Sequence, residues 1–135
     1  MGTWGTGAFE NDSALDFVQA IQDQGLQLLV AAFDDLPPED EWLDVQGEDA
    51  VAAAEIVAAA YGQGKPGLPP QVRQLVAQHG TAIRAMPGLP AKALQALSRV
   101  TADNSELKEL WAEVGDDQAW IAAIKDLERR LDAIP

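Results

Sequence analysis

The 135-residue sequence contains no cysteine, and this absence removes several kinds of chemistry at once. Disulfide bonds, thiolate zinc sites and cysteine nucleophiles all require a thiol. A chain without cysteine suits a reducing compartment, and its first fifteen residues lack both a basic start and an apolar run. We therefore expect a cytoplasmic protein without a secretory signal.

Long apolar runs and strand-forming residues are also scarce. The longest apolar stretch, AVAAAEIVAAAY at residues 50–61, is too short to span a bilayer and carries a glutamate. Phenylalanine, tyrosine and threonine are few, whereas alanine supplies 24 residues. Alanine favours helix, while β-branched and aromatic residues favour strands. The composition predicts a soluble, all-α protein.

Basic residues are absent from the first 64 residues, which carry thirteen acidic residues. The rest of the chain carries nine acids and nine bases, so the whole formal charge of −13 belongs to the first half. Such a surface repels nucleic acid and anionic membranes, and it attracts basic proteins or cations. Two interpretations stay open: a surface that only keeps the protein soluble, and a docking face for a basic partner.

Helical periodicity and capping signals predict one compact domain over residues 1–135, a bundle of about six helices that holds more than half of the chain. Asn11, Asp12 and Ser13 are all able to cap the first helix, and Ser13 and Asp16 fit the reciprocal capping pattern at its start. The third helix, at residues 47–61, is rich in alanine, which lets neighbouring helices approach closely. We therefore place it at the centre of the bundle.

Later boundaries are read in the same way. Asp103 and Glu106 frame the start of a helix near the C-terminus. His79, the only histidine, precedes a glycine and indicates a helix end. The segment GQGKPGLPP at residues 62–70 is the clearest break in the chain, and we expect a surface connection within the domain.

An acidic stretch, DDLPPEDEWLDVQGED, separates the second and third predicted helices and holds eight acids in sixteen residues. It lacks the acid spacing and the glycine of a calcium-binding EF-hand loop. We expect an irregular loop whose Trp42 and Leu43 tuck inward. If this loop docks a basic partner, neutralising Asp40, Glu41 and Asp44 should slow association and leave the fold intact.

The N-terminal residues 1–11 contain closely spaced glycines together with Trp4 and Phe9. Glycine permits tight and left-handed turns, and the two aromatic side chains supply apolar area that pins a terminus. No strand has room to precede these glycines, so a phosphate-binding loop is disfavoured. The segment is interpreted as a structural clasp.

Four acidic residues are candidates for chemistry. Glu10, Asp12 and Asp16 could form an oxygen-rich cluster that suits Mg²⁺ or Ca²⁺, although acids in a first helical turn are ordinary partners of the helix dipole. Glu55 lies among small apolar residues of the third helix, either on a solvent-facing alanine strip or partly buried with a partner. Burial would raise its pKa, as a general acid or base requires.

Three hypotheses for function follow. The leading one is a non-enzymatic interaction protein whose acidic N-terminal half binds a basic protein. The alternative is a small-ligand or metal-dependent site that uses Glu55 with Asp12 and Asp16. The third is a subunit whose surface serves self-assembly. A single histidine makes a poor metal site and the serines lack a nucleophile-elbow context, so no catalytic residue or cofactor is predicted.

Three stretches together resemble a known family: MGTWGTGAFENDSALDF, AAAEIVAAA and ADNSELKELWAEVGDDQAWIAAIKDLERRL. They are similar to the bacterial domain-of-unknown-function family 4259, and the resemblance covers essentially the whole chain. The opening Met-Gly-Thr-Trp-Gly, followed by Phe9, Asn11 and Asp12, is its most specific part. The resemblance implies a small helical bacterial protein and supplies no catalytic residue.

Overall fold

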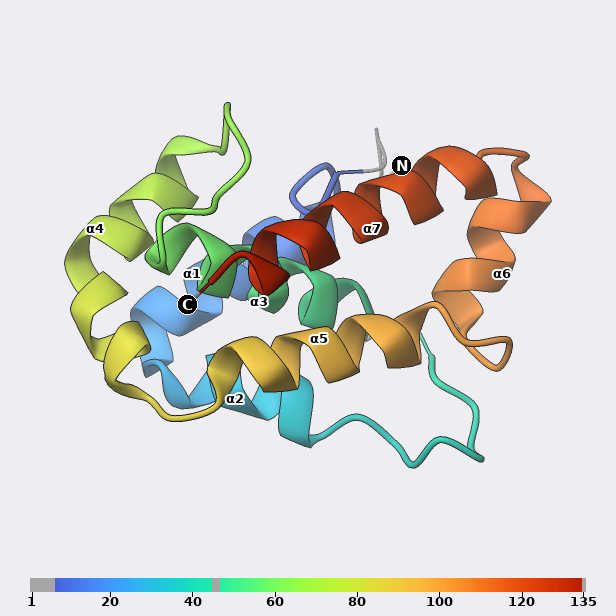
Figure 1. Ribbon diagram of the computed structural model, residues 1–135, viewed down its shortest axis with the longest axis horizontal. Helices are drawn as coiled ribbons and strands as arrows, with labels where there is room; N and C mark the ends of the chain where they lie inside the picture. Colours follow the sequence, from blue (N-terminus) through green and yellow to red (C-terminus); the bar gives the residue numbers. More distant parts are fainter. Residues whose placement is uncertain (1–6, 45–46, 135) are drawn as a thin grey trace.

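The structure, a computed structural model, describes residues 7–44 and 47–134 (Figure 1). These residues form seven α-helices rather than about six, and the helices hold more than half of the chain, as predicted. The described ranges contain no strand, only isolated bridge positions, among them the bridge between Leu43 and Ser105. The helices are α1 (Asp12–Gln24), α2 (Gln27–Asp34), α3 (Gly47–Ala60), α4 (Pro70–Ala85), α5 (Leu89–Val100), α6 (Glu106–Glu113) and α7 (Asp117–Asp132).

Helix α3 lies at the centre of the bundle, as its alanines predicted. It packs against each of the other six helices, and eleven of its fourteen residues are buried. In Figure 1, α5 and α7 extend lengthwise between α4 at one end and α6 at the other. Small side chains let several helices approach the same axis, because each contact needs little space. Within the described residues, no helix is both long and apolar enough to cross a membrane.

The cap of the first helix lies two residues earlier than the Ser13–Asp16 pattern predicts. Asn11 is the cap residue: its backbone is extended and its side-chain oxygen accepts a hydrogen bond from the backbone N–H of Ala14 at 2.8 Å. Ser13 already lies within the first turn, so the predicted capping role of Ser13 and Asp16 is wrong. An asparagine caps as well as a serine, and burial of Asn11 favours the earlier start.

Two later boundaries also differ from the prediction. Ser105, rather than Asp103, caps α6 and accepts a hydrogen bond from the backbone N–H of Lys108 at 3.4 Å. His79 lies inside α4 rather than at its end. The glycine that follows it, Gly80, is buried in the helix, where an added Cβ atom would lie 3.2 Å from the Arg84 guanidinium. This glycine therefore lies within the helix and does not end it.

Candidate functional site

Glu55 is buried within α3, and its carboxylate is fully partnered. Its side chain is 2% exposed. The Arg130 guanidinium of α7 donates through Nη1 to Oε2 at 2.7 Å and through Nη2 to Oε1 at 2.8 Å. The backbone N–H of Lys65 donates to Oε2 at 3.2 Å. Of the two surroundings considered for Glu55, the structure therefore shows the buried one with a partner.

Arg130 connects three parts of the chain through this pair. Besides Glu55, it donates to the carbonyl oxygen of Gln63 at 2.9 Å and to the Asp126 carboxylate at 2.9 Å. The hydrogen bonds to Glu55 raise the pKa of Arg130 above its ordinary value in spite of partial burial. Hydrogen bonds from Arg129 and Arg130 in turn lower the pKa of Asp126. The cluster joins α3, α7 and the connection between α3 and α4.

The space beside this ion pair is small. A cavity of about 30 Å³ lies against Gly7, Glu55, Lys65 and Arg130. That volume has room for a water molecule, whereas sites for organic ligands have volumes of roughly 300–1,000 Å³. The geometry therefore favours a structural role for Glu55, as the residue that ties α3 to α7.

The described part of the N-terminal segment forms a turn in front of α1. The carboxylate of Glu10 accepts a hydrogen bond from the backbone N–H of Gly7 at 3.1 Å, and the backbone N–H of Glu10 donates to the Gly7 carbonyl at 3.1 Å. Phe9 is buried in the core. Trp4, the other anchor of the predicted clasp, lies outside the described residues. Glu10 thus holds the turn.

The remaining acids of the predicted cluster lie in different surroundings. Asp12 is exposed in the first turn of α1, whereas Asp16 lines a groove on the α1–α2 side of the bundle. Glu55 lines a separate cavity against α7. In the part of the chain that the structure describes, no group of three or more histidine or acidic residues is arranged to hold a metal ion. The structure does not bring Glu55 together with Asp12 and Asp16.

An open groove of about 720 Å³ lies on the α1–α2 side of the bundle, and we call it the acidic groove. Helices α1 and α2 supply most of its wall, and the entry to α3 closes one side. Its lining combines four aspartates with a mainly apolar floor and includes no lysine, arginine or histidine. The lining residues are Ser13, Asp16, Phe17, Ala20, Leu28, Ala31, Ala32, Asp35, Leu36, Asp44 and Asp49.

Two carboxylates at the start of α3 are perturbed by this arrangement. Burial, and then the charge of Asp16 across the groove, raise the pKa of Asp49 above its ordinary value. Burial, together with the charge of Asp49, raises the pKa of Glu48, and a hydrogen bond from Ser13 partly opposes this shift. Burial first, and a neighbouring negative charge second, disfavour the charged forms of these two carboxyl groups, and a nearby cation would favour the charged forms.

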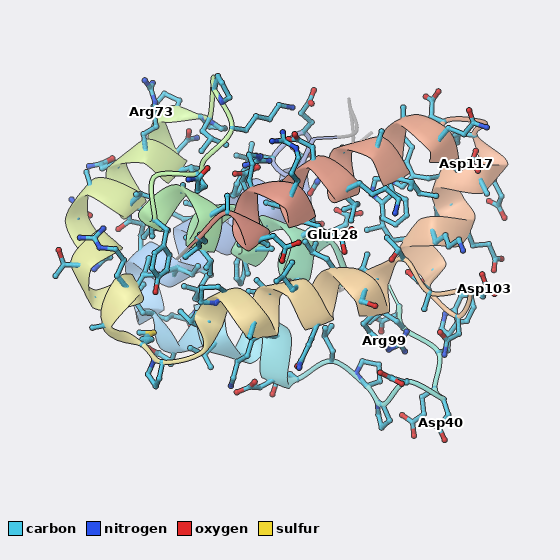
Figure 2. All side chains as sticks on the ribbon, viewed as in Figure 1. Asp40, Arg73, Arg99, Asp103, Asp117 and Glu128 are labelled. Atoms are coloured by element: carbon cyan, nitrogen blue, oxygen red, sulfur yellow. The ribbon has the colours of Figure 1, made fainter. Side chains whose placement is uncertain are left out.

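The acidic loop, residues 35–44, is held from behind by Arg99 of α5. This arginine is buried, and its guanidinium donates to the carbonyl oxygens of Pro37 and Pro38 at 3.3 Å and of Glu41 at 2.5 Å. Figure 2 shows Arg99 on the inner side of the loop and Asp40 at its outer tip. The backbone of the loop is therefore fixed, while its acidic side chains face solvent.

Asn104 and the chain beside it complete this support. The Asn104 side chain donates to the carbonyl oxygens of Glu39 and Glu41 at 2.7 and 2.6 Å. The backbone N–H of Leu43 donates to the Asn104 carbonyl at 2.9 Å, and the Leu43 carbonyl accepts from the backbone N–H of Glu106 at 2.8 Å. The predicted loop is thus irregular in outline but well connected to α5 and α6.

The prediction that Trp42 and Leu43 both tuck inward is half wrong. Leu43 is fully buried, but Trp42 is 50% exposed. Leu43 lies in an extended bridge, where successive side chains point to opposite sides. Burial of Leu43 therefore turns Trp42 outward, beside the exposed acids Asp40 and Glu41.

Sequence reasoning missed the residues that organise both sites. Arg130 is not among the residues that the sequence analysis singles out, yet it lies three residues after Leu127 and one before Leu131, both in the buried stripe of α7. This position at the edge of the stripe is a signal that could have indicated a buried partner. Arg99, in contrast, binds loop carbonyls about 60 residues away along the chain, and no local pattern predicts such a contact.

Comparisons with known proteins identify a family and no activity. Searches of curated proteins and of solved structures gave no significant match. The family model described as "Domain of unknown function (DUF4259)" matches residues 2–123. The matched range includes the acidic groove and the acidic loop, and it ends before Arg130. The chain belongs to this family of domains of unknown function, DUF4259.

Proposed function

We propose that the protein is a non-enzymatic interaction protein whose acidic N-terminal half docks a basic protein partner. The observation that carries the proposal is the acidic loop: its backbone is fixed by Arg99 and Asn104, and its tip presents Glu39, Asp40 and Glu41 to solvent beside the half-exposed Trp42. A preordered surface loses little conformational entropy on binding, which favours affinity. Exposed tryptophan is a common anchor in protein interfaces and attracts cationic side chains.

The first half also carries thirteen acids and no lysine or arginine of its own. Within the described residues, Asp34 pairs with Lys92 and Glu55 pairs with Arg130. Two further bases bind other groups: Lys108 pairs with Asp103 of the second half, and Arg99 donates to backbone carbonyl oxygens. The remaining field steers a basic protein toward this face and repels nucleic acid and anionic membranes. The cytoplasm of a bacterium is the setting that we propose.

Affinity capture from the native organism, followed by mass spectrometry at low and high salt, tests the proposal. A loop variant with Glu39→Gln, Asp40→Asn and Glu41→Gln is captured in parallel. Arg99 and Asn104 bind only backbone carbonyls of these residues, so the substitutions keep the bonds that shape the loop. We expect a basic partner that the wild type retains at low salt and that both high salt and the loop variant release.

A matched control separates the position of the charges from their number. The control variant carries Glu109→Gln, Glu113→Gln and Asp132→Asn, three exposed acids of the second half. It changes the net charge by the same amount as the loop variant and should still capture the partner. A partner that is neutral or acidic, or one that both variants capture equally, contradicts the proposal.

A further inference from the structure

The acidic groove combines two kinds of surface that the acidic loop alone does not offer. Its floor holds three large apolar side chains, Phe17, Leu28 and Leu36, which are each partly exposed. Four aspartates stand around this floor. An apolar surface framed by one sign of charge fits an occupant with an apolar face and charges of the opposite sign.

The shape of the floor suits a helix. Phe17 and Ala20 lie one turn apart on α1, and Leu28 and Ala32 lie one turn apart on α2. The alanines leave room for close approach of an incoming backbone, and the larger side chains on either side supply area to bury. The groove is open to solvent, so a segment of a polymer can enter it.

The charges select a basic occupant. Asp16 of α1 and Asp49 of α3 lie near enough that the first raises the pKa of the second. Asp35 and Asp44 line the groove where the acidic loop leaves α2 and approaches α3, so the groove and the loop are continuous. A second copy of this chain would bring a further formal charge of −13 and is disfavoured.

We propose that the acidic groove receives an amphipathic helical segment of the basic partner. The apolar face of that segment covers Phe17, Leu28 and Leu36, and its arginine or lysine side chains reach Asp16 and Asp49. This inference rests on the proposed function and specifies which part of the partner binds and where. The acidic loop then contributes to the encounter, and the groove holds the bound segment.

Selection from a display library of random peptides, about 16 residues long so that they can form four helical turns, tests the inference without a known partner. The wild-type protein is the bait. We expect selected peptides to repeat leucine-like residues at helical spacing with arginine or lysine between them. Nuclear magnetic resonance shifts on peptide addition should cluster at Phe17, Ala20 and Ala32.

A groove-filling variant, Ala32→Phe, provides the decisive comparison. Ala32 lines the groove and is partly exposed, so a larger side chain occupies the groove without entering the core. Its control is Ala82→Phe on α4, an exposed alanine of a helix that supplies no groove lining. The groove-filling variant should weaken peptide binding at least about tenfold, and the control should leave it unchanged.

The outcomes separate this inference from the proposed function. If basic peptides bind the Ala32→Phe variant as tightly as the wild type, the groove is not the docking site. The proposed function still holds in that case if the loop variant binds these peptides more weakly than the wild type does. Peptides without basic enrichment, or binding that is indifferent to salt, overturn both. Failure to select any peptide overturns the inference and leaves the proposed function to the capture experiment.

Discussion

Asp49 and Glu55 lie on the same helix, less than two turns apart, yet their surroundings are opposite. Glu55 is buried, and its carboxylate accepts hydrogen bonds from Nη1 and Nη2 of Arg130. Asp49 is half-buried in a groove that it shares with Asp16 and that no basic residue lines. The chain thus supplies a cation where a carboxylate must hold two helices together. In the groove, by contrast, Asp16 lies close enough to Asp49 to raise the pKa of that carboxyl group.

The free-energy cost of burying a charge accounts for the difference between the two sites. A fully buried charge without a partner is strongly destabilising, so Glu55 requires Arg130. A carboxylate at the edge of an open groove keeps contact with water, and crowding there costs much less. Stability therefore tolerates acids that lie close together at the edge of the groove, and the proposed binding function would make use of them.

The largest expected effect concerns the buried pair. Arg130→Met removes the cation and leaves Glu55 uncompensated, so the free energy of unfolding should fall by about 3–5 kcal/mol. Urea denaturation followed by circular dichroism measures it. The double variant Glu55→Leu, Arg130→Met removes both charges and should recover much of the loss.

Arg129→Met is the matched control for this prediction, because Arg129 is the exposed neighbour of Arg130 and pairs with Asp126 at the surface. Its cost should stay below about 1 kcal/mol. An equal loss in the free energy of unfolding for the two arginine variants would show that burial of Glu55 does not depend on its ion pair with Arg130.

Loss of the Arg99 support should lower stability less than loss of the buried ion pair does, and the effect should stay local to the acidic loop. Arg99→Met leaves the carbonyl oxygens of Pro37, Pro38 and Glu41 without their charged donor, and we expect a loss of about 2 kcal/mol. Hydrogen exchange at the amide of Leu43 should accelerate more than exchange in α3, because the loop opens separately from the core. Uniform acceleration across the chain would contradict a role confined to the loop.

The smallest expected effect concerns Asp49 in the acidic groove, where a substitution should raise the stability of the protein, whereas the substitutions above should lower it. Because burial and Asp16 raise the pKa of Asp49 in the folded state, folding favours its protonated form. The charged form therefore costs stability above the folded pKa, and this cost vanishes below the ordinary pKa of an aspartate. Asp49→Asn should stabilise the protein at neutral pH, by no more than about 1 kcal/mol since solvent screens the site, and should do nothing in acid.

Thermal unfolding at neutral and acidic pH measures this effect, with Asp23→Asn, an exposed acid of α1, as the control for net charge. A stabilisation that is the same at both pH values, or that the control reproduces, would mean that crowding in the groove has no energetic consequence.

The fold was largely predictable because local signals decide most of it. Apolar spacing located the helices, and the alanines of α3 indicated its central position. Errors arose where two local signals compete: Asn11 and Ser13 are both able to cap α1, and burial of the former decides between them. Gly80 carries the same sequence signal whether it ends a helix or packs within one.

The candidate site was less predictable because long-range contacts create it. The acids of the loop were visible in the sequence, but the support from Arg99 and Asn104 joins residues about 60 positions apart. The outward position of Trp42 depends on a bridge between Leu43 and Ser105. The acidic groove requires α1, α2 and the start of α3 to meet, which periodicity alone does not specify.

Steering of a basic partner by the acidic loop should be visible in the association rate with a captured partner. Stopped-flow measurements across a range of ionic strengths compare the wild type, the loop variant and the control variant of equal charge. The account predicts a rate that falls with salt, a slower rate for the loop variant at low salt, and convergence of the two once charges are screened beyond about 10 Å. Equal rates for the loop variant and the wild type at low salt would contradict it.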